Sequence, residues 1–315
     1  MKRNIFILFI VLLATIPVRS QLVVWNPEDI KLLTKQWEGE RSPDGRPKVS
    51  DAHLERLEKV SIEEAWEFLR RKGYENQFEN FSDIHENSWV IIHPDQTMVG
   101  RALTAQYTPM RFDFDDYLQE VGKKQNIEKV NNELPVSLLN EGDIYVADAY
   151  GKISDGTLMG DIIGNNVYRN SKRGVILNGS VRKLDALTEI EGFNAWIRGF
   201  DPSSISGMVC ASVNAPIRIG RVTVLPGDVV LAKRSGVIFI PPQFVVELIL
   251  SVEIAALRND FNLQRREGRI DNNTDFNEWL KRQPNLPMSK EELDAYLNRQ
   301  ANQPRNQQQT RSQRQ

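Results

Sequence analysis

Short apolar runs, separated by polar turns and helical segments, set the pattern of the central part of this chain. Each run is too short for an ordinary helix and too apolar for a surface, so each predicts a buried strand. The runs cover residues 89–93, 99–107, 144–147, 175–177 and 207–211. Helical segments alternate with them, from a capping box at 61–64 to a helix over 243–257. This alternation predicts an α/β fold.

The N-terminus has the pattern of a secretory signal over residues 1–20. Lys2 and Arg3 form a positive region, residues 5–16 are apolar but too short to span a bilayer comfortably, and small residues precede the expected cleavage before Gln21. No later segment is apolar enough to cross a membrane, so no stable span is expected after cleavage. We therefore expect an exported protein, periplasmic or secreted, with an uncleaved membrane anchor as the alternative.

Turn and capping signals divide the rest of the chain. Residues 21–60 are expected to form a helical N-terminal arm, since Asn26-Pro27-Glu28 is typical of a helix start and 42–45 is a turn. The α/β domain would then span 61–257. A polar C-terminal extension, 258–315, would contain one more short helix capped by Ser289 and would be disordered from about 301.

Residues 109–135 have the character of an insertion in the α/β domain. Phe112, Phe114 and Tyr117 alternate with aspartates, and the segment continues as a charged stretch toward Lys124. The pattern predicts a helix that is packed on the surface by its aromatic residues. A lid over a site, or a contact between subunits, is the alternative interpretation.

Composition narrows the classes of function. The net charge of −2 argues against a general nucleic-acid binder, so no nucleic-acid partner is expected. The single cysteine, Cys210, lies in an apolar run and is interpreted as a buried structural thiol. His53, His85 and His93 have no metal-ligand spacing and are interpreted as structural or surface residues.

The strongest chemical signal is Gly160-Asp161, followed after twenty residues by Arg182. A helix that begins near Asp161 presents free backbone N–H groups and a positive dipole end, which favour a carboxylate or phosphate. The strand at 175–177 is expected to end at 178–179, which places Arg182 just beyond a strand end, where α/β folds bind ligands. Its guanidinium can hold a carboxylate at two points.

This motif and two further blocks resemble the family of class II pyruvate aldolases and RraA-like proteins. The other blocks are 215–241, with the turn Pro226-Gly227-Asp228, and 99–104. The family includes 4-hydroxy-4-methyl-2-oxoglutarate aldolase, oxaloacetate decarboxylases and the regulator of ribonuclease activity A. The resemblance covers about 60–250 and implies a three-layer sandwich with a mixed central sheet. It also implies a homotrimer or hexamer with pockets between subunits.

One position departs from the family pattern. The family continues from the arginine to an aspartate that binds a divalent metal, Mg or Mn, whereas this chain has Lys183. An ammonium group repels a divalent cation, so Asp161 is left as the weak metal-site candidate. Asp185, Asp148 and Asp155 are further carboxylates without an established geometry.

The resemblance leaves two functions open. One is a carbon–carbon lyase that cleaves 4-hydroxy-2-oxo acids or decarboxylates oxaloacetate, with Arg182 and Asp161 as catalytic residues. Its substrate, a small 2-oxo acid or other small anion, would contact Gly160, Asp161, Ile162, Arg182 and Lys183. The alternative is a catalytically inactive member that acts as a binding or assembly protein. Lys183 is also a candidate for imine formation with a ketone.

Overall fold

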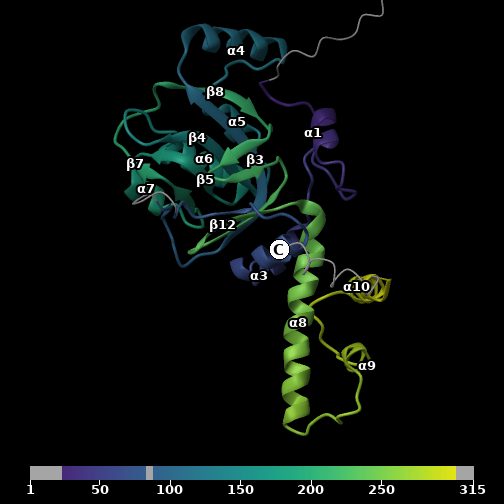
Figure 1. Cartoon of the computed structure of the whole chain (residues 1–315). Coiled ribbons are helices and arrows are strands. Elements are labelled where there is room, and N and C mark those ends of the chain that lie inside the picture. Colours follow the sequence, from purple (N-terminus) through teal and green to yellow (C-terminus); the bar gives the residue numbers. More distant parts are fainter. Residues whose placement is uncertain (1–22, 83–87, 303–315) are drawn as a thin grey trace, which may run out of the picture.

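The computed structural model describes residues 23–82 and 88–302, and a mixed sheet forms its centre (Figure 1). The strands are β1 (Phe78–Glu79), β2 (Val90–Ile91), β3 (Met98–Pro109), β4 (Asp143–Lys152), β5 (Val175–Val181), β6 (Ala195–Ile197), β7 (Gly199–Phe200), β8 (Met208–Val213), β9 (Ile217–Ile219), β10 (Val222–Val224), β11 (Val229–Lys233) and β12 (Gly236–Ile240). Within the described residues the sheet order is β1-β12-β11-β3-β4-β5-β6-β2, with β7 beside β5 and β8 beside β3. β9 and β10 form a separate hairpin.

The helices frame this sheet. They are α1 (Pro27–Leu33), α2 (Asp51–Leu57), α3 (Ile62–Arg71), α4 (Phe112–Lys124), α5 (Leu134–Ser137), α6 (Asp161–Ser171), α7 (Leu184–Thr188), the 3₁₀ turn η1 (Pro242–Phe244), α8 (Val245–Arg266), α9 (Phe276–Lys281) and α10 (Lys290–Asn302). The predicted capping box is present, because Ser61 and Glu64 bond each other's backbone N–H. The helix expected to reach Lys124 is α4. None of the described helices is both long and apolar enough to traverse a bilayer.

The middle of the sheet is parallel and its outer part is antiparallel. β3, β4, β5 and β6 run parallel, whereas β11 pairs antiparallel with both β3 and β12. Successive side chains of the central strands face opposite sides, as Tyr145 and Val146 of β4 do. The predicted α/β class with a mixed central sheet is confirmed.

Different elements pack against the two faces of the parallel strands. α5, α6 and α7 pack on one face, where Val167 and Leu187 are fully buried. The β9–β10 hairpin packs on the other face together with Phe81 and Trp89, whose rings meet edge to face. α2, α3 and α8 close the β11–β12 end of the sheet. The layer opposite α6 is therefore built of strands and loop rather than helices.

The N-terminal arm is fastened to the domain by a buried arginine. Arg46 is 1% exposed, and its guanidinium bonds Asp44 at 2.6 Å and Asp143 of β4 at 2.8 Å. The predicted turn at 42–45 is confirmed by the bond from Gly45 N to Ser42 O at 2.9 Å. A buried charge pair of this kind is costly to break, so it holds the arm in one position.

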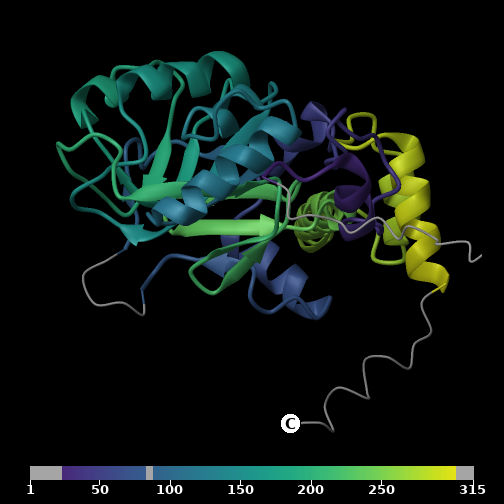
Figure 2. The ribbon, with the colours of Figure 1, turned by 90° about the horizontal axis from the view of Figure 1, so that it is seen from above.

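The C-terminal part differs from the sequence-based expectation. α8 continues to Arg266, so the prediction that this helix ends at 257 is wrong. The following segment, expected to be polar, contributes Phe276, Trp279 and Met288 to an apolar cluster with α8. In Figure 2, α8 is seen nearly end-on, with the yellow helices outside it. The cluster forms because sparse apolar residues of three helices converge, which a linear scan does not reveal.

Two further expectations need adjustment, and others lie outside the described residues. β5 does not end at 178–179 but continues to Val181, and only Val90–Ile91 of the run 89–93 forms a strand. The expected signal at 1–20, the tail at 303–315 and His85 fall outside the described residues.

Candidate functional site

The two ends of the Gly-Asp and Arg motif lie side by side. α6 begins at Asp161 with Gly160 as its N-cap. The Arg182 backbone N–H donates to Met159 O at 2.9 Å, and Met159 forms a parallel bridge with Val181. A Cβ at position 160 would lie 3.0 Å from Arg182 Cγ, which explains why glycine stands there. The extension of β5 to Val181 thus brings Arg182 against the start of α6.

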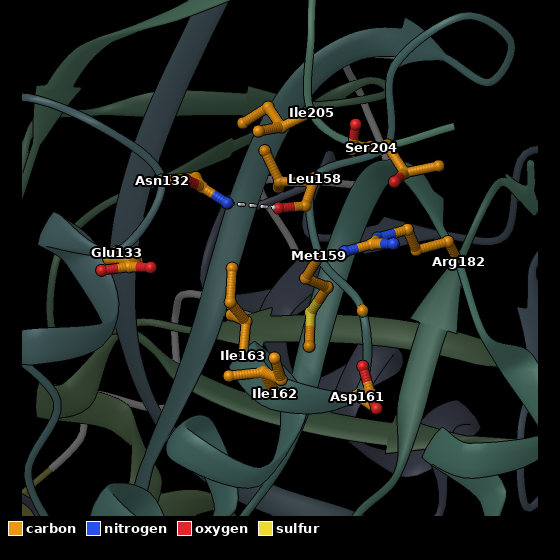
Figure 3. A pocket seen from close by; sticks show the side chains of 12 residues that line it. Asn132, Glu133, Leu158, Met159, Asp161, Ile162, Ile163, Arg182, Ser204 and Ile205 are labelled. Atoms are coloured by element: carbon orange, nitrogen blue, oxygen red, sulfur yellow. Dashed lines mark hydrogen bonds between the residues drawn. The ribbon is translucent and has the colours of Figure 1, made fainter. Parts of the chain in front are cut away.

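A small pocket opens at this junction (Figure 3). Its volume is about 210 Å³. Four segments build it: the loop before α6 with the first turn of α6, the residue after β5, and two loops from elsewhere in the chain. The lining residues are Asn132, Glu133, Thr157, Leu158, Met159, Gly160, Asp161, Ile162, Ile163, Arg182, Ser204 and Ile205. The structure therefore brings four of the five predicted site residues to one pocket, and Lys183 stands just outside its lining.

Arg182 is the cation of this pocket. Its side chain is partly buried, and Figure 3 shows its guanidinium directed inward near Met159. Within residues 23–82 and 88–302 this guanidinium has no hydrogen-bond or ion-pair partner. Among these residues Arg182 therefore takes part in no structural salt bridge. Its N–H groups are free to hold a carboxylate beside the positive end of α6.

Unlike Arg182, Lys183 forms an ion pair, and its partner is Asp161. Its Nζ lies 3.0 Å from Oδ1 and 3.1 Å from Oδ2 of that carboxylate. The hydrogen bond from Lys183 is the main reason that the pKa of Asp161 is lowered from its ordinary value. Lys183 itself has φ 55°, a left-handed conformation that lysine seldom adopts. An ammonium thus stands against both oxygens of the Asp161 carboxylate.

The carboxylates around the pocket do not fit a divalent cation. Both oxygens of Asp161 face the Lys183 ammonium, and the described residues contain no group of three or more His, Cys, Asp or Glu side chains able to hold a metal. Asp148 is buried and bonded to Asn178 at 2.7 Å. Asp155 and Asp185 do not line the pocket. Magnesium is usually held by one or two carboxylates together with water, and the carboxylate of the motif, Asp161, is already paired with an ammonium.

Two lining residues, Asn132 and Glu133, were not identified as site residues from the sequence. Both belong to the segment 109–135, whose only signal was its character as an insertion. Asn132 Nδ2 donates to Leu158 O at 3.0 Å, and Figure 3 shows this bond across the pocket wall. Residues 158 and 132 meet only in the folded chain, so no local pattern could have linked them.

Two other expectations concern single residues. Cys210 is buried, and burial raises the pKa of its thiol to about 12, so the structural interpretation is confirmed. Among the histidines, His53 Nε2 lies 3.0 Å from Glu292 of α10 and helps to hold the C-terminal helices. Neither His53 nor His93 lines the pocket.

Comparison with known proteins gives several partial matches. "Protein DlpA" of Legionella pneumophila is 26% identical over 153 residues, which are 48% of this chain and 23% of that protein. A "Putative 4-hydroxy-4-methyl-2-oxoglutarate aldolase" of Shewanella oneidensis is 31% identical over 96 residues, 30% of this chain and 57% of that protein. The chain thus spans less than two thirds of the length of these relatives.

The fold is shared with solved structures. RraAS2 of Streptomyces coelicolor, described as an unusual member of the RNase ES inhibitor RraA protein family, superposes with a TM-score of 0.54 at 23% identity. It covers 69% of this chain and 100% of its own. At this identity the likeness shows the fold alone. A family model, RraA-like with the description Aldolase/RraA, matches residues 47–239. Because this match covers more than half of the sequence, the chain belongs to the RraA-like family.

Proposed function

We propose that this RraA-like protein binds a small 2-oxo acid in the pocket between α6 and the end of β5, without a divalent cation. The observation that carries the proposal is the Arg182 guanidinium, which has no hydrogen-bond or ion-pair partner among the described residues. It is directed into the pocket beside the first turn of α6. The ion pair of Lys183 with Asp161 supports the metal-free form, because it neutralises the remaining carboxylate of the motif.

The ligand's carboxylate would lie between Arg182 and the first backbone N–H groups of α6. Both are donors, and the helix dipole favours the same negative charge. The adjacent keto oxygen would then face the same donors, since only one bond separates the two carbons. Arg182 and the residues 160–162 would thus bind the carboxylate of the ligand and polarise its keto group. The Lys183 ammonium within its ion pair has no lone pair for attack on a ketone, which argues against the imine hypothesis.

A carbon–carbon lyase is the second candidate. It is favoured by the retained Gly160-Asp161 and Arg182 positions and by relatives that carry an aldolase name. Arg182 would hold the substrate carboxylate, and the backbone N–H groups of 160–162 would stabilise the enolate that forms when the carbon–carbon bond breaks. The test is to follow pyruvate release from oxaloacetate and from 4-hydroxy-2-oxo acids, with and without added magnesium or manganese. If pyruvate is released no faster than in the uncatalysed reaction, the lyase candidate is rejected.

Calorimetric titration of the full chain with pyruvate tests the binding proposal. We expect saturable binding in the presence of EDTA, with a dissociation constant that added magnesium does not change. Arg182→Gln should weaken the binding by roughly ten- to hundred-fold, because a charged hydrogen bond to the carboxylate is lost. Arg169→Gln is the matched control, since Arg169 is an exposed residue of α6 that does not line the pocket. Equal weakening by both substitutions would contradict the proposal.

Assembly and export are further parts of the proposal. Ile162, 68% exposed, lines the pocket, and Phe200, 61% exposed, lies on β7 beside β5. These exposed apolar residues support a homotrimer or hexamer with contacts at the site. Sedimentation analysis tests it, and a monomer at every concentration would reject it. For export through residues 1–20, mass spectrometry of the mature protein should find an N-terminus at Gln21; an intact Met1 would refute cleavage.

A further inference from the structure

We infer that the pocket selects 2-oxo acids with one carboxylate and a short apolar side chain over dicarboxylic 2-oxo acids. This inference rests on the proposed function and adds the class of ligand. It follows from the distribution of charge and apolar surface around the pocket, which differs on its two sides.

Arg182 and Glu133 lie on opposite sides of the pocket. Figure 3 shows the Arg182 guanidinium entering from one side and the Glu133 carboxylate standing on the other. Glu133 is exposed, and within the described residues its carboxylate has no hydrogen-bond or ion-pair partner. Its backbone N–H donates to Asn131 Oδ1 at 3.0 Å, which holds it at the start of α5. A ligand whose first carboxylate binds Arg182 therefore points its other end toward the side of the pocket that carries the Glu133 carboxylate.

Apolar side chains form part of the surface between these two charges. Leu158 and Met159 are 1% and 2% exposed and form the buried part of the wall, and Figure 3 shows Ile163 and Ile162 below them. Ile205 stands at the opening, 37% exposed. A methyl or short branched side chain would remove some of this surface from water, whereas a carboxylate placed here would lose its own hydration without a partner.

Among the described residues that line the pocket, Arg182 is the single basic one. Lys183 does not line the pocket, and its Nζ lies against both oxygens of Asp161. Asn132 donates its amide N–H to Leu158 O. The lining therefore offers one cation, Arg182, for one carboxylate. A second carboxylate would meet the Glu133 carboxylate, which has no cationic partner among the described residues.

The test is a calorimetric series on the full chain near neutral pH. Pyruvate, 2-oxobutyrate and 3-methyl-2-oxobutanoate represent the monocarboxylates, and oxaloacetate and 2-oxoglutarate the dicarboxylates. We expect monocarboxylates to bind at least about ten-fold more tightly, with a preference that shrinks as salt is added. Glu133→Gln keeps the side-chain size and should reduce the preference by strengthening dicarboxylate binding alone. Glu120→Gln, on the exposed surface of α4, is the control and should change neither class.

The outcomes separate this inference from the proposed function. Tighter binding of the dicarboxylates, or a preference that Glu133→Gln leaves unchanged, overturns the selectivity while leaving 2-oxo acid binding intact. Absence of binding by every compound of the series overturns the proposed function and this inference with it. Salt-sensitive selectivity that disappears in Glu133→Gln and persists in Glu120→Gln supports both.

Discussion

Lys183→Asp is the substitution that most directly tests whether Lys183 keeps a divalent cation out of this pocket. It replaces the ammonium that lies 3.0 and 3.1 Å from the two Asp161 oxygens with a carboxylate. The local charge of the pair changes from zero to −2, and two carboxylates without an ammonium partner stand where one paired carboxylate stands now. We expect the variant to bind magnesium, because oxygen ligands of this kind are the ones that magnesium prefers.

The expected gain in magnesium affinity is moderate, because the side chains at positions 161 and 183 are not buried. The side chains of Lys183 and Asp161 are 48% and 28% exposed, so solvent screens much of the attraction for the ion. We therefore expect about ten- to hundred-fold tighter magnesium binding than in the unmodified protein. Calorimetric titration with magnesium chloride at low salt measures it directly, without reference to any enzymatic activity.

Two control variants separate charge from ligation. Lys183→Met removes the repelling charge but supplies no ligand, so it should give only part of the gain. Asp161→Asn combined with Lys183→Asp should lose most of it, since the two carboxylates would bind the ion together. If Lys183→Asp binds magnesium no better than Lys183→Met, the reasoning that Lys183 stands in the place of a metal ligand is refuted.

Three further predictions concern other parts of the molecule. Gly160→Ala should weaken pyruvate binding about ten-fold with little change in melting temperature, because its Cβ would lie 3.0 Å from Arg182 Cγ and displace that side chain; unchanged binding would show that Arg182 does not hold the ligand. Burial raises the pKa of Asp228 to about 7, so the folded state holds a proton that the unfolded state releases between about pH 4 and 7. Stability should therefore fall as pH rises through this window, by up to about 1.4 kcal/mol per pH unit, and Asp228→Asn should flatten the profile in urea denaturation measured at several pH values. Trp279→Ala removes a ring 5.2 Å from Phe261 and 5.9 Å from Phe276; it should cost about 3–5 kcal/mol and speed amide hydrogen exchange in α9 and α10 while sparing β3–β5.

Local signals in the sequence were sufficient for most of the elements. The capping box at 61–64 predicted the start of α3, and the apolar runs at 144–147 and 175–177 predicted β4 and β5. These signals depend on residues within one helical turn or one strand of each other, so they survive in the linear chain. The end of α8 was missed because the helix continues over polar residues, which its packing against α9 and α10 supports.

The motif could also be located in the sequence, but the ion pair between Lys183 and Asp161 could not be predicted from it. Gly160, Asp161 and Arg182 are brought together as expected. Whether Lys183 repelled a metal from a distance or paired with Asp161 depends on the path of the backbone at φ 55°, which a substitution pattern does not contain. The role of segment 109–135 was left open for the same reason, since its neighbours lie far away in the chain.

The sequence by itself determined the alternation of strands and helices, the position of the Gly160-Asp161 and Arg182 motif, and the presence of Lys183 after the arginine. Only the tertiary structure decided that Lys183 pairs with Asp161, that Glu133 faces Arg182 across the pocket, and that the C-terminal helices share an apolar cluster. The physical reason is the separation along the chain over which each kind of interaction acts. Caps, turns and apolar runs act between neighbours along the chain, whereas a pocket is defined by contacts between residues 22 or more positions apart.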